Sequence, residues 1–148
     1  MSTGKVIGVN LSARRGIKKI NVGSGYLLAD YGLQGDAHAG TSRQVSVFMA
    51  ERAEELAGAL GLPFQPGDFA ENITVQGINL EGVGVGARLL VGEAMVEVTQ
   101  IGKQEDEPSS LFFPGPAPLK TEGIYCRVIK SGWVKEGDRV TLNGDAGE

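Results

Sequence analysis

Glycine spacing is the feature that most constrains the fold of this chain. Of the 148 residues, 23 are glycine and only 6 are proline. No collagen period or low-complexity stretch accompanies this excess, so it indicates many tight turns between short elements. The segments between the turns are apolar runs of strand length. In chain order these runs cover residues 6–11, 26–29, 44–48, 73–75, 88–91, 95–99, 124–129 and 140–142.

One segment has a different period. From Met49 to Leu60 apolar residues recur every three or four positions, which predicts a helix with one apolar face, ended by Gly61 and Pro63. Directly before it, residues 44–48 alternate polar and apolar side chains, the pattern of a half-buried strand. Many short strands with one main helix predict a mainly β protein, a closed or nearly closed β-barrel. We expect residues 1–148 to form one domain.

Bulk composition restricts the classes of partner. The net charge of −4 and the pI of about 5.1 disfavour a duplex nucleic-acid binder, which usually carries a basic excess. No apolar run approaches the ~20 residues that a membrane span needs. The first residues show no signal-peptide pattern, and a single cysteine cannot form an internal disulfide. We therefore expect a cytoplasmic protein that binds neither nucleic acid nor membrane.

A set of motifs, taken in order, resembles the MOSC family (molybdenum-cofactor sulfurase C-terminal domain), in particular its small standalone members. Each motif alone is common, but the ordered set extends from Lys5 to Leu142. The motifs are Arg15-Gly-Ile-Lys-Lys19, Gly32-Leu-Gln-Gly-Asp-Ala-His-Ala-Gly40, Arg43-Gln-Val-Ser-Val47, Pro66-Gly-Asp-Phe-Ala-Glu-Asn-Ile73, Val85-Gly86, Thr99-Gln-Ile-Gly-Lys103, Glu122-Gly-Ile-Tyr-Cys-Arg-Val128 and Gly137-Asp138.

The resemblance implies a fold, a cofactor and partners. The fold would be the MOSC barrel, which is like the barrel of pyruvate kinase. The cofactor would be molybdopterin or the molybdenum cofactor, with molybdenum or tungsten as the metal. The partners would be molybdenum or tungsten enzymes, or proteins of cofactor biosynthesis.

This chain departs from the family pattern after Lys103. Similar members continue with a Cys-His pair and further cysteines, whereas Glu105 and Ser109 take the cysteine positions here. A carboxylate cannot carry a persulfide and is a harder, oxygen-type ligand. Cys126, flanked by apolar residues, is expected to be buried and inert. We therefore assign no catalytic residue and no metal ligand.

Three functions stay open at this point. The first is a carrier, storage or delivery module for a molybdopterin-type cofactor, which the missing cysteines favour. It can instead be a cofactor sulfur-transfer protein or a molybdenum-dependent reductase of N-hydroxylated compounds, which the resemblance favours. A third reading is a degenerate barrel that serves protein interaction.

A phosphorylated pterin needs amide groups for its ring and cationic or N–H donors for its phosphate. Positions that offer such groups lie in the basic turn 14–19, in the loop after Gly35, around Asn72 and near two strand segments. The candidate cofactor-binding residues are Lys19, His38, Arg43, Asn72, Lys103 and Arg127. Each also has a structural interpretation, such as a solvated basic turn, a satisfied turn histidine or an asparagine in a bulge. We expect Asp36 to hydrogen-bond its own loop and Glu71 to support the loop beside Asn72.

Overall fold

The computed structural model describes residues 3–14, 17–102 and 122–143, and it is mainly β as predicted. Lys103, Glu105 and Ser109 lie outside the described residues. The elements are β1 (Thr3–Leu11), β2 (Ile20–Asn21), β3 (Ser24–Leu28), β4 (Gly32–Leu33), β5 (Val45–Met49), α1 (Ala50–Ala59), β6 (Ile73–Gln76), β7 (Arg88–Val91), β8 (Ala94–Ile101), β9 (Ile124–Lys130), β10 (Gly132–Lys135) and β11 (Arg139–Asn143).

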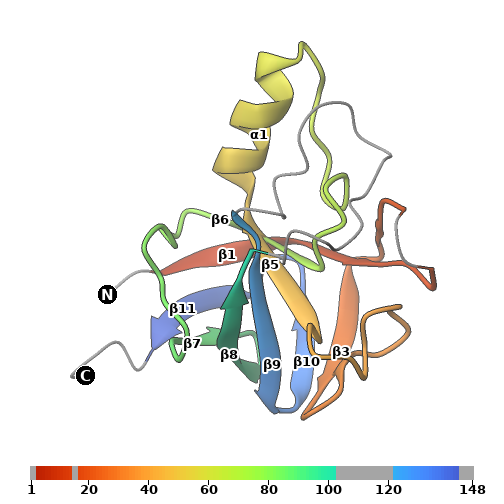
Figure 1. Ribbon diagram of the computed structural model, residues 1–148, viewed down its shortest axis with the longest axis vertical. Coiled ribbons are helices and arrows are strands. Elements are labelled where there is room, and N and C mark those ends of the chain that lie inside the picture. The colour runs from red at the N-terminus through yellow and green to blue at the C-terminus, as the bar shows by residue number, and fades with distance from the viewer. Residues whose placement is uncertain (1–2, 15–16, 103–121, 144–148) are drawn as a thin grey trace.

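Seven of the strands close into a barrel (Figure 1). Their order is β11-β7-β8-β9-β5-β6-β1, and antiparallel pairing of β1 with β11 closes the circle. β5 and β6 pair in parallel, so the chain must cross over between them, and α1 lies in this crossover. β2 extends the sheet beyond β1, and a second sheet has the order β10-β3-β4. The prediction of a closed barrel is confirmed.

The barrel interior is filled by apolar side chains from alternate strand positions. They include Val6, Val47, Ile73, Val96 and Cys126, all exposed by 1% or less. Such alternation follows from the strand period of two, which directs every second side chain inward. At roughly 25 cal/mol per Å² of apolar surface removed from water, this interior is the main source of stability.

The prediction that residues 44–48 form a half-buried strand is wrong, because both faces of β5 are buried. Val45 and Val47 face the barrel interior. Phe48, on the outer face, packs in a second cluster with Ala53 of α1 and with Phe69, whose ring centroid is 6.0 Å away. The helix and the following loop thus cover the side of the strand that alternation assigns to solvent.

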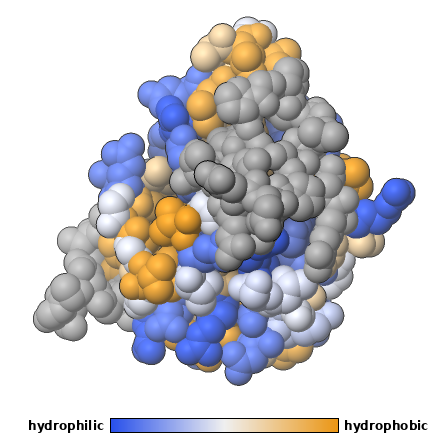
Figure 2. Space-filling view, in the orientation of Figure 1, coloured by the Kyte–Doolittle hydropathy of each residue, from blue (hydrophilic) through white to orange (hydrophobic). Residues whose placement is uncertain are grey.

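Helix α1 stands on the barrel wall and points away from it (Figure 1). It begins directly after β5, and Ala53 and Ala57 are buried as its apolar period predicts. Its tip is apolar at the surface (Figure 2), where Leu60 is 44% exposed. Within the described residues, no helix combines the length and apolarity that crossing a bilayer requires.

Candidate functional site

A buried carboxylate organises the loop between β4 and β5. The Asp36 side chain is fully buried and accepts hydrogen bonds from the Ser12 backbone N–H at 3.0 Å and from the His38 backbone N–H at 3.0 Å. The prediction that Asp36 braces its own loop is confirmed. Burial acts to raise the pKa of Asp36, but the contacts with His38 and the charge of Lys19 outweigh it and hold that pKa well below its usual range.

Lys19 supplies the charge that matches Asp36. The Lys19 Nζ–Asp36 Oδ1 distance is 2.8 Å, and the lysine side chain is only 1% exposed. Its neighbours in the basic turn, Arg14 and Lys18, are exposed. The same Nζ lies 3.3 Å from His38 Nδ1, and the His38 side chain is 19% exposed. A buried ion pair therefore lies directly beneath a histidine that reaches the surface.

Arg43 follows His38 on the same loop. The Thr41 hydroxyl donates to the His38 carbonyl at 2.7 Å and accepts from the Arg43 backbone N–H at 3.1 Å, so it couples the two backbones. The Arg43 guanidinium lies over the Tyr125 ring, 5.8 Å from its centroid, a distance within cation–π range. Arg43 is partly exposed as a residue, but its Nε is buried.

Asn72 joins two strands of the barrel through its side-chain amide. Its Oδ1 accepts from the Ser46 backbone N–H at 2.9 Å, and its Nδ2 donates to the Asn10 carbonyl at 3.1 Å. The residue is 1% exposed. This arrangement agrees with the structural interpretation of Asn72, because the amide is engaged between β5 and the end of β1.

Glu71, next to Asn72, is fully buried. Its carboxylate accepts from the backbone N–H groups of Gly67 and Phe69 and from the Thr74 hydroxyl, the last at 2.6 Å. Burial raises the pKa of Glu71, although these hydrogen bonds oppose the shift. The prediction that Glu71 supports the loop is confirmed.

Four of the predicted residues thus lie at one end of the barrel, where β1 ends and β5 and β6 begin. Asn72 contacts Asn10, and two residues further along the chain Ser12 contacts Asp36 of the Lys19 and His38 cluster. This region is called the loop end below and comprises Lys19, Asp36, His38, Arg43 and Asn72.

Arg127 lies apart from this hydrogen-bond network. It projects from the outer face of β9, where its Nε is 3.1 Å from Glu97 Oε1 and its Nη1 is 3.3 Å from Asp30 Oδ1. Its charge is therefore already matched by two carboxylates at the surface. Lys103 lies outside the described residues.

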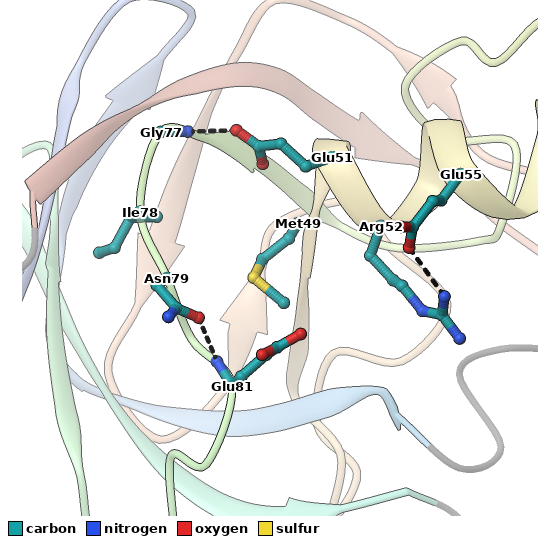
Figure 3. Close-up of a pocket in the computed structure, with 8 residues that line it drawn as sticks. All are labelled: Met49, Glu51, Arg52, Glu55, Gly77, Ile78, Asn79 and Glu81. Atoms are coloured by element: carbon teal, nitrogen blue, oxygen red, sulfur yellow. Dashed lines mark hydrogen bonds and ion pairs between the residues drawn. The ribbon is translucent and has the colours of Figure 1, made fainter.

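Two cavities lie at the other end of β5 and β6, where α1 begins. The larger has a volume of about 420 Å³ (Figure 3), and the smaller, of about 200 Å³, shares Met49 and Glu81 with it. Of the predicted residues that the structure describes, none lines either cavity. The larger cavity is lined by Met49, Glu51, Arg52, Glu55, Gly77, Ile78, Asn79 and Glu81.

The charges around these cavities disfavour an anion. Arg52, the single cation among the described residues of the larger lining, is held by Glu55 at 2.9 Å and by both oxygens of Glu122 at 2.8 and 2.9 Å. Glu51 and Glu81 add further negative charge, so the cavity repels phosphate and attracts cations. The sequence analysis missed the Arg52–Glu122 ion pair, because the two residues are 70 positions apart. The three-residue spacing of Arg52 and Glu55 is a local signal for an ion pair on a helix.

The described residues offer few groups for metal binding or thiol chemistry. No group of three or more His, Cys, Asp or Glu side chains suited to hold a metal ion occurs among them. Cys126 is fully buried in the barrel interior, and burial, with a smaller contribution from Glu97, raises the pKa of its thiol. The prediction that Cys126 is buried is confirmed, and its inertness stays a prediction.

Comparison with known proteins agrees with this architecture. The family model for the MOSC domain matches residues 34–102, which include the loop end from Asp36 to Asn72 and most of the barrel wall. Residues 34–102 of this chain therefore match the MOSC domain family. Among curated proteins, the chain is 29% identical to YflK of Bacillus subtilis (strain 168) over 138 residues, covering 86% of its own length. It spans 62% of the length of YflK.

Solved structures share the barrel of this protein. The YuaD protein from Bacillus subtilis superposes with a TM-score of 0.71 at 22% identity, covering 95% of this chain and 97% of YuaD. YiiM from Geobacillus stearothermophilus gives a TM-score of 0.62 at 22% identity, covering 94% of this chain and 72% of YiiM. At these identities the likeness concerns the fold.

Proposed function

We propose that this protein binds a molybdopterin-type cofactor without a covalent bond and serves to carry, store or deliver it. The match to the MOSC domain family supports the choice of cofactor. The observation that carries the non-covalent part is the position of Cys126, the single cysteine of the chain, which is sealed inside the barrel with a raised thiol pKa. No thiol of this chain is therefore available to hold sulfur or to ligate a metal as thiolate.

The donor groups of the loop end fit an anionic, phosphorylated pterin. Arg43 offers the guanidinium of a partly exposed residue, and His38 offers a ring nitrogen on the same loop. Lys19 and Asn72 are engaged within the protein, so we assign them positioning roles beneath these two contacts. Arg127 is not part of the proposed site, because Glu97 and Asp30 already match its charge.

When bound, the cofactor supplies a dithiolene that ligates molybdenum or tungsten. The residues of this chain bind and orient its organic part. The guanidinium of Arg43 matches a phosphate in charge and in fork geometry. Asp36 and Asn72 fix the loop that carries Arg43 and His38, so the contacts are organised before the ligand arrives. Delivery partners would be molybdenum or tungsten enzymes or proteins of cofactor biosynthesis.

An enzymatic alternative stays open in one form. A sulfur-transfer role for this chain conflicts with the buried Cys126, because a persulfide carrier must be reachable by a donor and an acceptor. Reduction of an N-hydroxylated compound by the loaded protein would have to proceed without a thiol ligand from this chain, and an activity assay on the loaded protein decides between reductase and carrier.

Titration of the purified protein with molybdopterin, followed by pterin fluorescence, tests the proposal. We expect saturable binding that Arg43→Ala weakens about tenfold, the loss of one charge-assisted contact. Arg139→Ala, an exposed arginine on β11, is the matched control and leaves affinity unchanged. Cys126→Ala also leaves affinity unchanged. Absence of binding overturns the proposal and favours a barrel that serves protein interaction.

A further inference from the structure

The contact between Lys19 and His38 determines what the histidine offers to a ligand. We infer that Lys19 holds His38 in the tautomer that carries its proton on Nε2, so that His38 presents a hydrogen-bond donor to the loop end. The identity of the ligand rests on the proposed function, but the tautomer does not.

The geometry leaves one role for His38 Nδ1. A lysine ammonium has three donors and no acceptor. Lys19 Nζ is 2.8 Å from Asp36 Oδ1 and 3.3 Å from His38 Nδ1, and its side chain is 1% exposed. Nδ1 must therefore accept with its lone pair, because a proton on Nδ1 would place two donors face to face, and the lysine side chain is buried away from water.

The opposite tautomer has a weaker partner. It would donate Nδ1–H to Asp36 Oδ2, but that distance is 3.6 Å, beyond the usual range of a hydrogen bond. Asp36 Oδ2 is already occupied by the His38 backbone N–H at 3.0 Å. Metal-binding histidines commonly use this carboxylate arrangement to free Nε2 as a ligand. Here the buried ammonium takes the place of the carboxylate at Nδ1.

The consequence is a defined class of ligand atom. With Nδ1 engaged and a proton on Nε2, the partly exposed face of the ring donates to a lone pair, such as a carbonyl oxygen, a ring nitrogen or a phosphate oxygen. A divalent metal ion, which needs a free lone pair, is not a ligand for this ring. His38 is thus a specificity contact, and Lys19 is a positioning residue that acts through it.

Nitrogen-15 NMR of the ligand-free protein tests the tautomer directly. His38 is the only histidine, so the long-range proton–nitrogen spectrum contains one imidazole. At mildly alkaline pH we expect an unprotonated Nδ1 and a protonated Nε2. A protonated Nδ1 in the unmodified protein overturns the inference, whether or not any variant folds.

Three variants test the positioning role of Lys19. Lys19→Met is expected to shift the ring toward a mixture of tautomers, and Lys19→Met with Asp36→Asn does the same without a buried uncompensated charge. Lys18→Met, at the exposed neighbouring lysine, leaves the spectrum unchanged. If Lys19→Met gives the same His38 spectrum as the unmodified protein, the positioning role of Lys19 is contradicted.

Affinity for molybdopterin then tests the donor. His38→Gln, whose amide nitrogen imitates Nε2–H, is expected to keep affinity within about threefold, whereas His38→Ala loses about tenfold. Equal losses in both variants argue against a donor at this position. The tautomer is measured without cofactor, so the two proposals can fail separately. Failure to bind molybdopterin refutes the proposed function but not the tautomer, and the wrong tautomer refutes this inference but not the proposed function.

Discussion

Asp36→Asn is the sharpest test of how the loop end is held together. The side chain is fully buried and accepts from Ser12, Lys19 and His38. Asparagine has one acceptor oxygen, so its amide nitrogen must face one of these donors, and Lys19 loses its counter-charge. Removing one partner of a buried ion pair costs about 3–5 kcal/mol. We expect a loss of that size in the free energy of unfolding, measured by urea titration.

A double-mutant cycle isolates the ion pair from the backbone contacts. Lys19→Met alone should also be strongly destabilising, because it leaves Asp36 charged and buried. The double variant should lose less than the sum of the two by about 1–3 kcal/mol. Additive losses, or a loss below about 1 kcal/mol for Asp36→Asn, would refute the buried pair as the organiser of the loop.

The difference in stability between the unmodified protein and Asp36→Asn depends on pH with a defined sign. Because the pKa of Asp36 is lowered in the folded protein, its stabilisation is present above its ordinary value of 3.8 and is lost as pH falls through the folded pKa. The stability gap between the unmodified protein and Asp36→Asn should therefore be full at neutral pH and shrink below pH 3.8. A gap that grows on acidification contradicts this assignment.

Three further variants or probes test other parts of the structure. The pKa of Glu71 is raised, so urea titrations should show the unmodified protein losing stability relative to Glu71→Gln as pH rises above 4.5. Gly67→Ala places a Cβ 2.2 Å from the Lys19 carbonyl oxygen at φ +96° and should cost about 3 kcal/mol or more, whereas Gly58→Ala, with open space in α1, should gain about 0.5–1 kcal/mol. Cys126 should resist a thiol reagent in the native protein and react fully in denaturant.

The sequence predicts most of the barrel because strand pattern and turn residues agree locally. Each apolar run found in the sequence overlaps a barrel strand or β3. The missed strands, β2, β4 and β10, are two to four residues long, too short for a period to show. The burial of both faces of β5 was missed for another reason, since it depends on α1 and Phe69 packing over Phe48.

The sequence predicted which residues belong to the candidate site but not what each of them contacts. Lys19 was one of several cations in a turn, and only the fold shows it buried on Asp36 while Lys18 stays exposed. Asn72 was identified for its amide, but its partners come from β1 and β5, 62 and 26 residues away. Such long-range contacts leave no local signal, because pairing across a barrel is set by topology.

The two ends of the barrel differ in charge among the described residues, and this difference supports the end proposed for an anionic ligand. Of the described residues that line the larger cavity beside α1, Glu51 and Glu81 are acidic, and the cation Arg52 is paired with Glu55 and Glu122. A phosphate placed there would meet like charge without a free donor.

At the loop end, by contrast, the charges of the buried Lys19 and Asp36 match each other, and Arg43 is a further cation on the same loop. A direct comparison follows: Glu81→Gln should leave molybdopterin affinity unchanged or slightly raised, whereas Arg43→Ala weakens it. A larger loss for Glu81→Gln than for Arg43→Ala would move the site to the α1 end.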